Sequence, residues 1–297
     1  MQRPTLACEI TADGVVAACA GENGHRLELL TGRELKEGVL APDLTEHNVL
    51  QPEILAQAIR EVLGGAGGRT KDVIAVLPDT ACRVVLLDFE ELPAKPEEAD
   101  AVVRFRLKKS LPFDVEKARV SYQMLPSAEG VRVVAAVGLA AVLDEYEQAF
   151  RNAGYAPGIV IPSMLAALGA VAAARPTLVV KVDAHTTSVA ILESDKLQLF
   201  RTVENNRGRA LDGELLADEV YPSVVFFQDT YHLNLEQIFV SGLADSAQAV
   251  EALHSQTGLE VRELVDESRM NAMGNAASSV ARSQRWRLAG VLGALSS

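Results

Sequence analysis

The stretch Leu178–Val203, LVVKVDAHTTSVAILESDKLQLFRTV, decides the fold of this chain. Its apolar residues form three runs separated by two short polar turns. The first turn is Ala184–Ser188, directly after Asp183, and the second is Glu193–Lys196. Short apolar runs between polar turns are typical of buried β-strands. The stretch therefore predicts a β-meander whose first strand ends in a carboxylate, from Asp183, and whose first turn carries hydroxyl groups, among them those of Thr186 and Thr187.

Length, charge and cysteine content narrow the class of protein. The chain has 297 residues, enough for two medium domains or one bilobal unit. Its 28 basic and 40 acidic residues give a net charge of −12, which argues against non-specific binding to nucleic acid or to an anionic membrane. The 3 cysteines and 5 histidines show no metal-ligand spacing, and the cysteines no disulfide pattern. These features predict a protein of the reducing cytosol without a metal site. The N-terminus has no basic-plus-apolar leader, so we expect no signal peptide.

One uncharged segment, Ala156–Ala174, has about the length of a short membrane span. Pro162 divides it into an apolar run typical of a strand and an alanine-rich half typical of a core helix, and proline suits the first turn of that helix. We therefore expect a buried strand followed by a core helix, and no membrane span.

The first half of the chain alternates strands and helices. A hairpin is predicted around Asp13-Gly14, and apolar residues at helical spacing predict a helix over Pro52–Leu63. The glycine-rich residues 64–68 are expected to cap this helix, because a phosphate-binding loop precedes its helix and ends in Gly-Lys-Ser/Thr. The segment Thr80–Gly154 has the order strand, helix, strand, strand, helix, which predicts a compact α+β module.

The second half continues beyond the meander with helices and short strands. Their predicted ranges are helix Gly213–Phe227 interrupted at Pro222, strand Gln237–Ser241, helix Ala244–Leu253, strand Glu260–Leu264, and helices Ala272–Ala281 and Arg285–Leu295. The two halves echo each other, because each begins with a strand pair that bears an acid, Glu9 in the first and Asp183 in the second. The break between them falls near Ala173–Pro176.

Several segments carry a resemblance to a known family. The longest is Arg104–Gln123, RFRLKKSLPFDVEKARVSYQ, in which a helix, a Pro-Phe pair and a short acidic link lead into a strand that ends near Tyr-Gln. The others are Val134–Val137 leading into a helix, the run Ala153–Pro157, and the strand–Pro-Ser–helix unit at Ile159–Leu168. Together with the Asp183 meander, they resemble PilM, the actin-like ATPase family of type IV pilus assembly, which is related to FtsA.

The resemblance implies an α/β, bilobal actin-like (ribonuclease H-like) fold over nearly the whole chain. Residues 1–175 would form the first lobe, with residues 80–154 inserted as a small α+β subdomain. Residues 176–297 would form the second lobe, and its last helix is expected to return to the first lobe. The second lobe would be reduced, because about 35 residues separate Val203 from Phe239 and a full subdomain needs on the order of twice that number.

The resemblance also implies a nucleotide site, shared in outline with actin, Hsp70 and hexokinase. In this superfold an acid at a strand end, followed by small residues in a tight turn, faces a nucleotide. The residues that match these positions, and that would contact Mg-ATP if binding is retained, are Glu9, Asp183, Thr186, Thr187 and Gly242. The alternative roles are structural: Asp183 would cap its turn through the amides of Thr186 and Thr187, and Glu9 would be a solvated acid at a strand end.

Departures from the family pattern argue that this site is degenerate. The family's Asp-Ile-Gly becomes Glu9-Ile10-Thr11, and a β-branched residue in place of glycine crowds a phosphate. In the second turn Ala184-His185 replaces small residues, and after the meander Asn205–Gly208 replaces a Gly-Gly pair. Leu243 replaces the second glycine of another Gly-Gly pair, and we expect it to enter nucleotide space.

The resemblance implies a cytoplasmic protein at the inner face of the inner membrane. PilM proteins bind the N-terminal tail of PilN, a bitopic membrane protein, in a groove of the first lobe. The candidate partner surface lies on a helix predicted over Pro96–Ser110, where Val102 and Phe105 lie off the apolar line that faces the core, and Arg104 and Lys108 flank them. The alternative is that this basic face is only a solvated flank.

We therefore expect a PilM-like scaffold with a degenerate nucleotide site. An active Mg-ATP-binding ATPase of the same fold is the first alternative, and it would use Glu9 and Asp183. A small-molecule kinase would need a catalytic base, for which the sequence offers no candidate. The cytoplasmic part of a type II secretion L-type protein would need a membrane helix after the second lobe, and the apolar stretch after Arg285-Trp286-Arg287 is too short for one.

Overall fold

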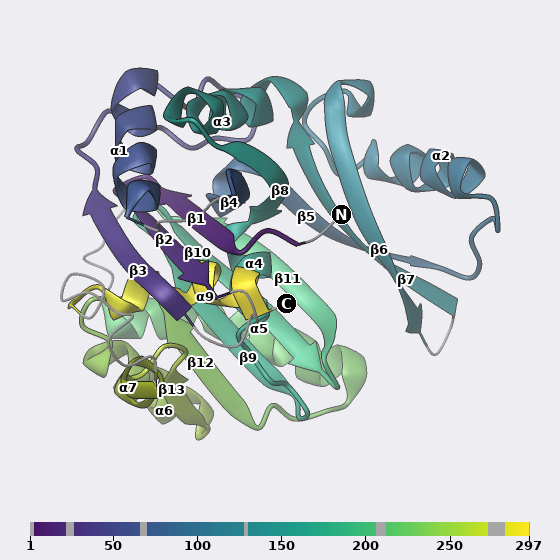
Figure 1. Cartoon of the computed structure of the whole chain (residues 1–297). Coiled ribbons are helices and arrows are strands. Elements are labelled where there is room, and N and C mark those ends of the chain that lie inside the picture. Colours follow the sequence, from purple (N-terminus) through teal and green to yellow (C-terminus); the bar gives the residue numbers. More distant parts are fainter. Residues whose placement is uncertain are drawn as a thin grey trace.

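The structure is a computed structural model, and it describes residues 3–21, 27–65, 70–127, 130–205, 212–272 and 283–296. Two five-stranded sheets and one three-stranded sheet organise these residues (Figure 1). The predicted glycine cap at residues 64–68, the departure at Asn205–Gly208 and the predicted helix Ala272–Ala281 lie partly or largely outside the described residues.

The first sheet has the strand order β3-β2-β1-β4-β8. Its strands are β1 (Leu6–Thr11), β2 (Gly14–Ala20), β3 (Leu27–Glu34), β4 (Asp72–Leu77) and β8 (Ala156–Pro162). β1 to β3 form an antiparallel meander, whereas β4 pairs parallel to both β1 and β8. The predicted hairpin is present, and Thr11 Oγ1 donates to the Asp13 carboxylate across its turn at 2.9 Å.

The second sheet repeats this topology with the order β11-β10-β9-β12-β13. Its strands are β9 (Thr177–Val182), β10 (Thr186–Glu193), β11 (Lys196–Glu204), β12 (Gln237–Ser241) and β13 (Glu260–Glu263). β9 to β11 are the predicted meander, and β12 runs parallel to both β9 and β13. The twofold echo in the sequence is therefore a repeated five-stranded unit.

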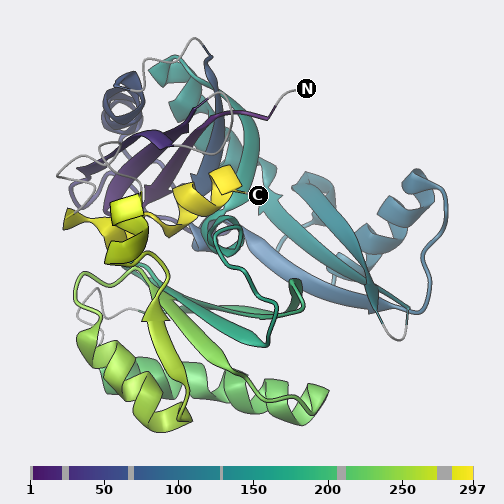
Figure 2. The same cartoon turned by 60° about the horizontal axis from the view of Figure 1, so that its bottom comes forward.

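Helices and sheets alternate in layers (Figure 2). α1 (Pro52–Gly64) and α3 (Ala140–Ala153) cover the outer face of the first sheet. α5 (Gly213–Tyr231) and α6 (Ala247–Thr257) cover the outer face of the second sheet. α4 (Ser163–Leu168) and α9 (Ala289–Ser296) lie between the two sheets.

The space between the sheets is an apolar core that both lobes share. Ala7 and Ile74 of the first sheet and Val179 and Ala190 of the second belong to one buried cluster, together with residues of α4 and α9. We call this cluster the interlobe core. Since α9 packs against β1 and α4, the end of the chain lies against the first lobe.

The third sheet, β5-β7-β6, projects to one side of the first lobe (Figures 1 and 2). It contains β5 (Arg83–Phe89), β6 (Ala118–Ser127) and β7 (Gly130–Leu139), and α2 (Pro96–Leu107) covers one face. α3 packs instead on the first sheet, through residues such as Tyr146 and Phe150. The predicted module boundary at Gly154 is therefore too late as judged by packing, because the core of the module ends with β7.

Two predicted helices differ in the structure. α5 runs through Pro222 without interruption, because Pro222 lies on the exposed face, where water can bind the carbonyl that proline leaves without a donor. The predicted helix Arg285–Leu295 is divided into a 3₁₀ turn, Arg285–Arg287, and α9. A short helix that the sequence analysis missed, α7 (Glu267–Ala272), precedes them. None of the helices in the described ranges combines the length and the apolar character needed to cross a membrane.

Candidate functional site

A buried ion pair links the two lobes. Glu9 on β1 is 0% exposed and Lys181 on β9 is 6% exposed, and Lys181 Nζ lies 3.2 Å from Glu9 Oε1. Ser163, the first residue of α4, also donates its hydroxyl to Glu9 Oε1. The expectation that Glu9 is a solvated acid is wrong: β1 lies in the middle of the sheet, and the alternation along this strand turns Glu9 toward the interlobe core.

The other carboxylate oxygen of Glu9 faces α9. Glu9 Oε2 is buried and has no hydrogen-bond partner among the described residues. A Cβ atom added to Gly290 would lie 2.3 Å from it, so only glycine lets α9 approach the carboxylate so closely. The helix therefore packs directly over the ion pair.

A second buried carboxylate, Asp79, lies near the same pair. It follows β4, and its two oxygens accept from the Met164 amide at 2.9 Å and from the Ser188 hydroxyl at 2.8 Å. Asp79 therefore joins the first lobe, through α4, to β10 of the second lobe. The sequence analysis missed Asp79, Ser163 and Lys181.

The charges of this cluster are coupled. Burial alone would lower the pKa of Lys181, but the negative charges of Glu9, Asp183 and Asp79 outweigh it, so the pKa of Lys181 is raised above its usual value. Burial raises the pKa of Asp79, while the Lys181 charge, the Met164 amide and the Ser188 hydroxyl act in the opposite direction. Lys181 is therefore held as an ammonium ion that compensates buried carboxylates.

The structural counterpart of Glu9 is Lys181, not Asp183. In the first lobe Thr11 pairs with Gly14 across a two-residue turn, and in the second lobe Asp183 donates its amide to the Thr186 carbonyl across a turn of the same length. Thr11 thus corresponds to Asp183, and two residues earlier Glu9 corresponds to Lys181. The two equivalent strands carry opposite charges at equivalent positions, and these charges meet.

Asp183 caps its own turn, although not through the amides that the sequence analysis expected. Its Oδ1 accepts from the Ala184 amide at 2.7 Å. Thr186 is buried, and Thr187 is fully buried, with its hydroxyl donating to Glu219 on α5 at 3.1 Å and accepting from Asn205 at 3.3 Å. The hydroxyl of Thr187 is thus already occupied within the second lobe.

Gly242 directly follows β12 and has a backbone conformation that requires glycine. Its φ is +92°, and a Cβ there would lie 1.7 Å from the Val182 carbonyl oxygen. Its amide donates to the Trp286 carbonyl at 2.9 Å. Leu243, which follows Gly242, belongs to the apolar core of the second lobe and also lines the small cavity beside this turn, so its expected entry into nucleotide space stays a prediction.

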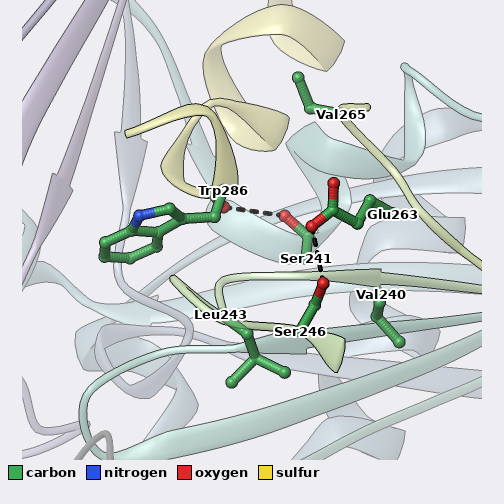
Figure 3. A pocket seen from close by; sticks show the side chains of 7 residues that line it. All are labelled: Val240, Ser241, Leu243, Ser246, Glu263, Val265 and Trp286. Carbon is green, nitrogen blue, oxygen red and sulfur yellow. Dashed lines mark hydrogen bonds between the residues drawn. The ribbon is translucent and has the colours of Figure 1, made fainter. Parts of the chain in front are cut away.

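A small cavity lies beside this turn (Figure 3). Its lining residues are Val240, Ser241, Leu243, Ser246, Glu263, Val265 and Trp286. The indole of Trp286 points away from the other side chains of the group. The cavity volume is about 10 Å³, room for a single water molecule, whereas pockets for small ligands measure roughly 300–1,000 Å³. A nucleotide base does not fit there.

The predicted partner residues lie on the outer side of α2. Phe105 is 68% exposed and Val102 is 37% exposed, while Val103 and Leu107 face the module core. Arg104 Nε donates to Asp100 at 2.7 Å, and Lys108 Nζ lies 3.9 Å from Glu116. The helix therefore presents an apolar edge formed by Val102 and Phe105. On its flanks, Arg104 is paired with Asp100, and Lys108 makes only a long contact with Glu116.

The cysteines and acids form no metal centre in the part of the chain that the structure describes, where no group of three or more His, Cys, Asp or Glu side chains is placed to hold an ion. All three cysteines are free thiols. Burial raises the pKa of Cys82 to about 12 and raises that of Cys8 further, so both stay protonated and unreactive at neutral pH.

Comparison with known proteins shows the fold. No protein-family model and no curated protein matches the chain. Among solved structures, one described as the PilM–PilN type IV pilus biogenesis complex is similar, with a TM-score of 0.82 and 22% identity over 99% of this chain and 98% of that chain.

Two further solved structures share the fold at lower similarity. One is a Bacteroides thetaiotaomicron protein described as having an actin-like ATPase fold and unknown function, with a TM-score of 0.53 and 12% identity over 90% of this chain and 94% of that chain. The other is the ethanolamine utilization protein EutJ from Carboxydothermus hydrogenoformans, with a TM-score of 0.52 and 11% identity over 100% of this chain and 90% of that chain. The expected bilobal α/β fold of actin-like type is confirmed, and so is the resemblance to PilM at the level of the fold.

Proposed function

We propose that this chain is a PilM-like scaffold of a type IV pilus or related secretion platform, and that it binds the N-terminal cytoplasmic tail of a PilN-like membrane protein. The observation that carries the proposal is the match over nearly the whole length of both chains to a structure of a PilM–PilN complex. Binding to such a tail would keep the protein at the inner face of the inner membrane, as a peripheral component.

The scaffold is proposed to work without a nucleotide between its lobes. Three features support this. Glu9, which the family pattern places near a metal ion, is neutralised internally by Lys181. Asp183 is engaged with its own turn, and the Gly242 amide is taken by Trp286. Each group that matches a nucleotide contact therefore already has a partner in the chain or lies in the core.

We place the tail-binding surface on the α2 edge, which consists of Val102, Arg104, Phe105 and Lys108. Val102 and Phe105 are three residues apart on a helix, so their side chains lie on one face. An exposed phenylalanine beside a second apolar residue supplies an anchor of the kind that dominates peptide binding. Because Arg104 is held by Asp100, we expect it to contribute mainly its aliphatic stem, and Lys108 to meet polar groups of the tail.

The test is a titration of the full chain with a synthetic peptide that has the sequence of the N-terminal tail of the PilN-like protein from the same organism. We expect saturable binding, and we expect Phe105→Ala to weaken it about tenfold or more, as loss of an interface anchor does. The matched control is Phe226→Ala, which removes a phenylalanine of similar exposure, 53%, from α5 in the other lobe. This control should bind like the unmodified chain.

The outcomes separate the function from the surface. Failure of the tail to bind at all, to a chain whose fold is verified by circular dichroism, would overturn the scaffold proposal. Binding that Phe105→Ala leaves unchanged would overturn the placement on α2, while the scaffold proposal would stand with another surface.

A further inference from the structure

The segment Gln284–Arg287 contacts both lobes in alternation. Gln284 and Arg287 reach the first lobe, whereas Arg285 and Trp286 reach the second. The segment lies just before α9, between the turn that joins β1 to β2 and the end of β12. We call it the latch.

On the second lobe, the latch is held by main-chain and charged contacts, of which Figure 3 shows the hydrogen bond between Ser241 and Trp286. The Trp286 carbonyl accepts from the Gly242 amide at 2.9 Å and from the Ser241 hydroxyl at 3.1 Å. Arg285 donates from Nη2 to Glu263 Oε2 at 3.0 Å and from Nε to the same oxygen at 3.2 Å. These contacts attach the latch to the ends of β12 and β13.

On the first lobe, the guanidinium of Arg287 lies against the turn after β1. Arg287 Nη2 donates to Asp13 Oδ2 at 3.1 Å, and Nη1 donates to the Asp13 carbonyl at 3.4 Å. A Cβ on Gly14 would lie 2.1 Å from Arg287 Nη1, so the guanidinium fills the space that glycine leaves open. Gln284 Nε2 adds a long contact of 3.4 Å to Glu34.

The latch leaves buried polar atoms without partners. Arg287 Nε and Gln284 Oε1 are buried, and neither has a hydrogen-bond partner among the described residues. An unsatisfied buried polar atom loses its hydration without compensation, and this lowers the stability of the closed arrangement. The lobes themselves are held by five-stranded sheets and apolar cores, so separating the latch from the lobes requires less free energy than unfolding either lobe.

We propose that Gln284–Arg287 opens as a unit while both lobes stay folded, and that its opening uncovers the Asp13-Gly14 turn and the Ser241-Gly242 turn together. A ligand that binds the main chain at these turns has to displace the Trp286 carbonyl and the Arg287 guanidinium first. The latch thereby controls access to this side of the interlobe region. The inference goes beyond the proposed scaffold function and does not depend on any pilus partner.

Hydrogen exchange of the unmodified chain tests the proposal directly. The Gly242 amide donates to the latch, whereas the Val180 amide lies within β9, which is paired on both sides. We expect Gly242 to exchange faster than Val180, with a rate that low concentrations of urea leave unchanged, because a local opening exposes little surface. Exchange of Gly242 only together with Val180, at the same urea-dependent rate, would overturn the proposal.

The single tryptophan provides a second readout. Trp286 is the only tryptophan of the chain, so its fluorescence reports on the latch alone. We expect Arg285→Ala to shift its emission to the red and to increase acrylamide quenching. We expect both Arg285→Ala and Arg287→Ala to speed Gly242 exchange about tenfold or more through loss of a charge-assisted hydrogen bond. For Arg287→Ala the exchange rate is the readout, because the Arg287 guanidinium lies 4.5 Å from the centroid of the Trp286 ring and its removal changes the fluorescence directly. The far-UV circular dichroism should stay unchanged.

Arg262→Ala is the matched control, because Arg262 pairs with Glu260 on its own strand, β13, and this pair lies within the second lobe. It should leave fluorescence and exchange as they are. If the two latch variants behave like this control, the latch is not held by these contacts and the proposal is wrong. If a latch variant does not fold, the exchange experiment on the unmodified chain still decides.

Discussion

At the scale of single residues, Glu9 and Lys181 each occupy a buried position on a strand face that carries no other charge. Taking two charges out of water is costly, and their attraction offsets this cost only while both are present. Ser163 and Lys181 share Glu9 Oε1, and Asp79 lies close enough for its charge to act on Lys181. Removing either partner therefore leaves an uncompensated charge between the lobes.

A double-mutant cycle measures this coupling. We expect Lys181→Met and Glu9→Gln each to lower the free energy of unfolding by about 3–5 kcal/mol, the range for breaking a buried ion pair. The double variant should lose clearly less than the sum of the two, as urea denaturation will show. The same kind of cycle on the exposed pair Lys95 and Glu98 should give roughly 0–1 kcal/mol. Additive losses at Glu9 and Lys181 would contradict the pairing.

The pH dependence of stability tests Asp79. Because its pKa is raised in the folded chain, the native state keeps a proton that the unfolded chain loses above about pH 3.9. The stabilising contribution of Asp79 to the free energy of unfolding is thus fully present below that pH. It is lost as the pH rises through the pKa of Asp79 in the folded chain. Relative to Asp79→Asn, the unmodified chain should lose stability across this acidic window and then stay level, as urea titrations at several pH values will reveal. A gain in the stability of the unmodified chain relative to Asp79→Asn as the pH rises would contradict this prediction.

The sequence alone indicated that Glu9 belongs to the candidate site, but it did not predict that the Glu9 side chain is buried and paired. A lone charge inside an apolar strand run was visible twice, as Glu9 in LACEIT and Lys181 in LVVKV, with opposite signs. Two such charges at equivalent positions of a repeated unit are the signal that indicates a buried pair. The signal was hidden because Asp183, two residues further along, was taken as the counterpart of Glu9. That register is settled only by the length of the two turns.

At the scale of elements, local patterns predicted strands and hairpins well and boundaries less well. The meander over Leu178–Val203 and the hairpin at Asp13-Gly14 depend on alternation and turn residues, which are local. Whether α3 packs on the module or on the first sheet depends on contacts with α1, far away in the sequence, so the order of elements could not decide it.

Pro222 shows how a helix overrides a local breaker. α5 buries Leu216, Val220, Val224 and Phe227 against the second sheet, and this apolar face outweighs the one hydrogen bond that proline cannot make. We expect Pro222→Ala to raise the free energy of unfolding by up to about 3 kcal/mol, since it restores that bond and removes a clash with the preceding turn. Thermal denaturation measures the gain, and a loss of stability instead would indicate that α5 needs the local geometry of proline.

At the scale of the whole molecule, the same five-stranded unit occurs twice and the two copies pack through α4 and α9. Two lobes were predicted from the resemblance to the actin-like family and from the strand pair that begins each half. It could not predict that the lobes share a core, since the residues of that core come from both ends of the chain, including Ala7 and Leu292. A shared core favours one fixed arrangement of the lobes, in which the groups expected to bind a nucleotide are engaged.

The behaviour toward Mg-ATP follows from this arrangement. A ligand that binds only the native state adds about 2.7 kcal/mol of stability at a hundredfold excess over its dissociation constant, a rise that thermal melting detects easily. We expect no change in melting temperature with millimolar Mg-ATP, because Glu9 is neutralised by Lys181, the Gly242 amide is taken and the cavity beside it has room for only one water molecule. Asp183→Ala is the control. Because this change removes the acceptor of the Ala184 amide, it can lower the melting temperature by itself. The quantity to compare between the two chains is therefore the change in melting temperature on adding Mg-ATP. A clear shift in the unmodified chain that Asp183→Ala abolishes would favour the active ATPase over the scaffold without nucleotide.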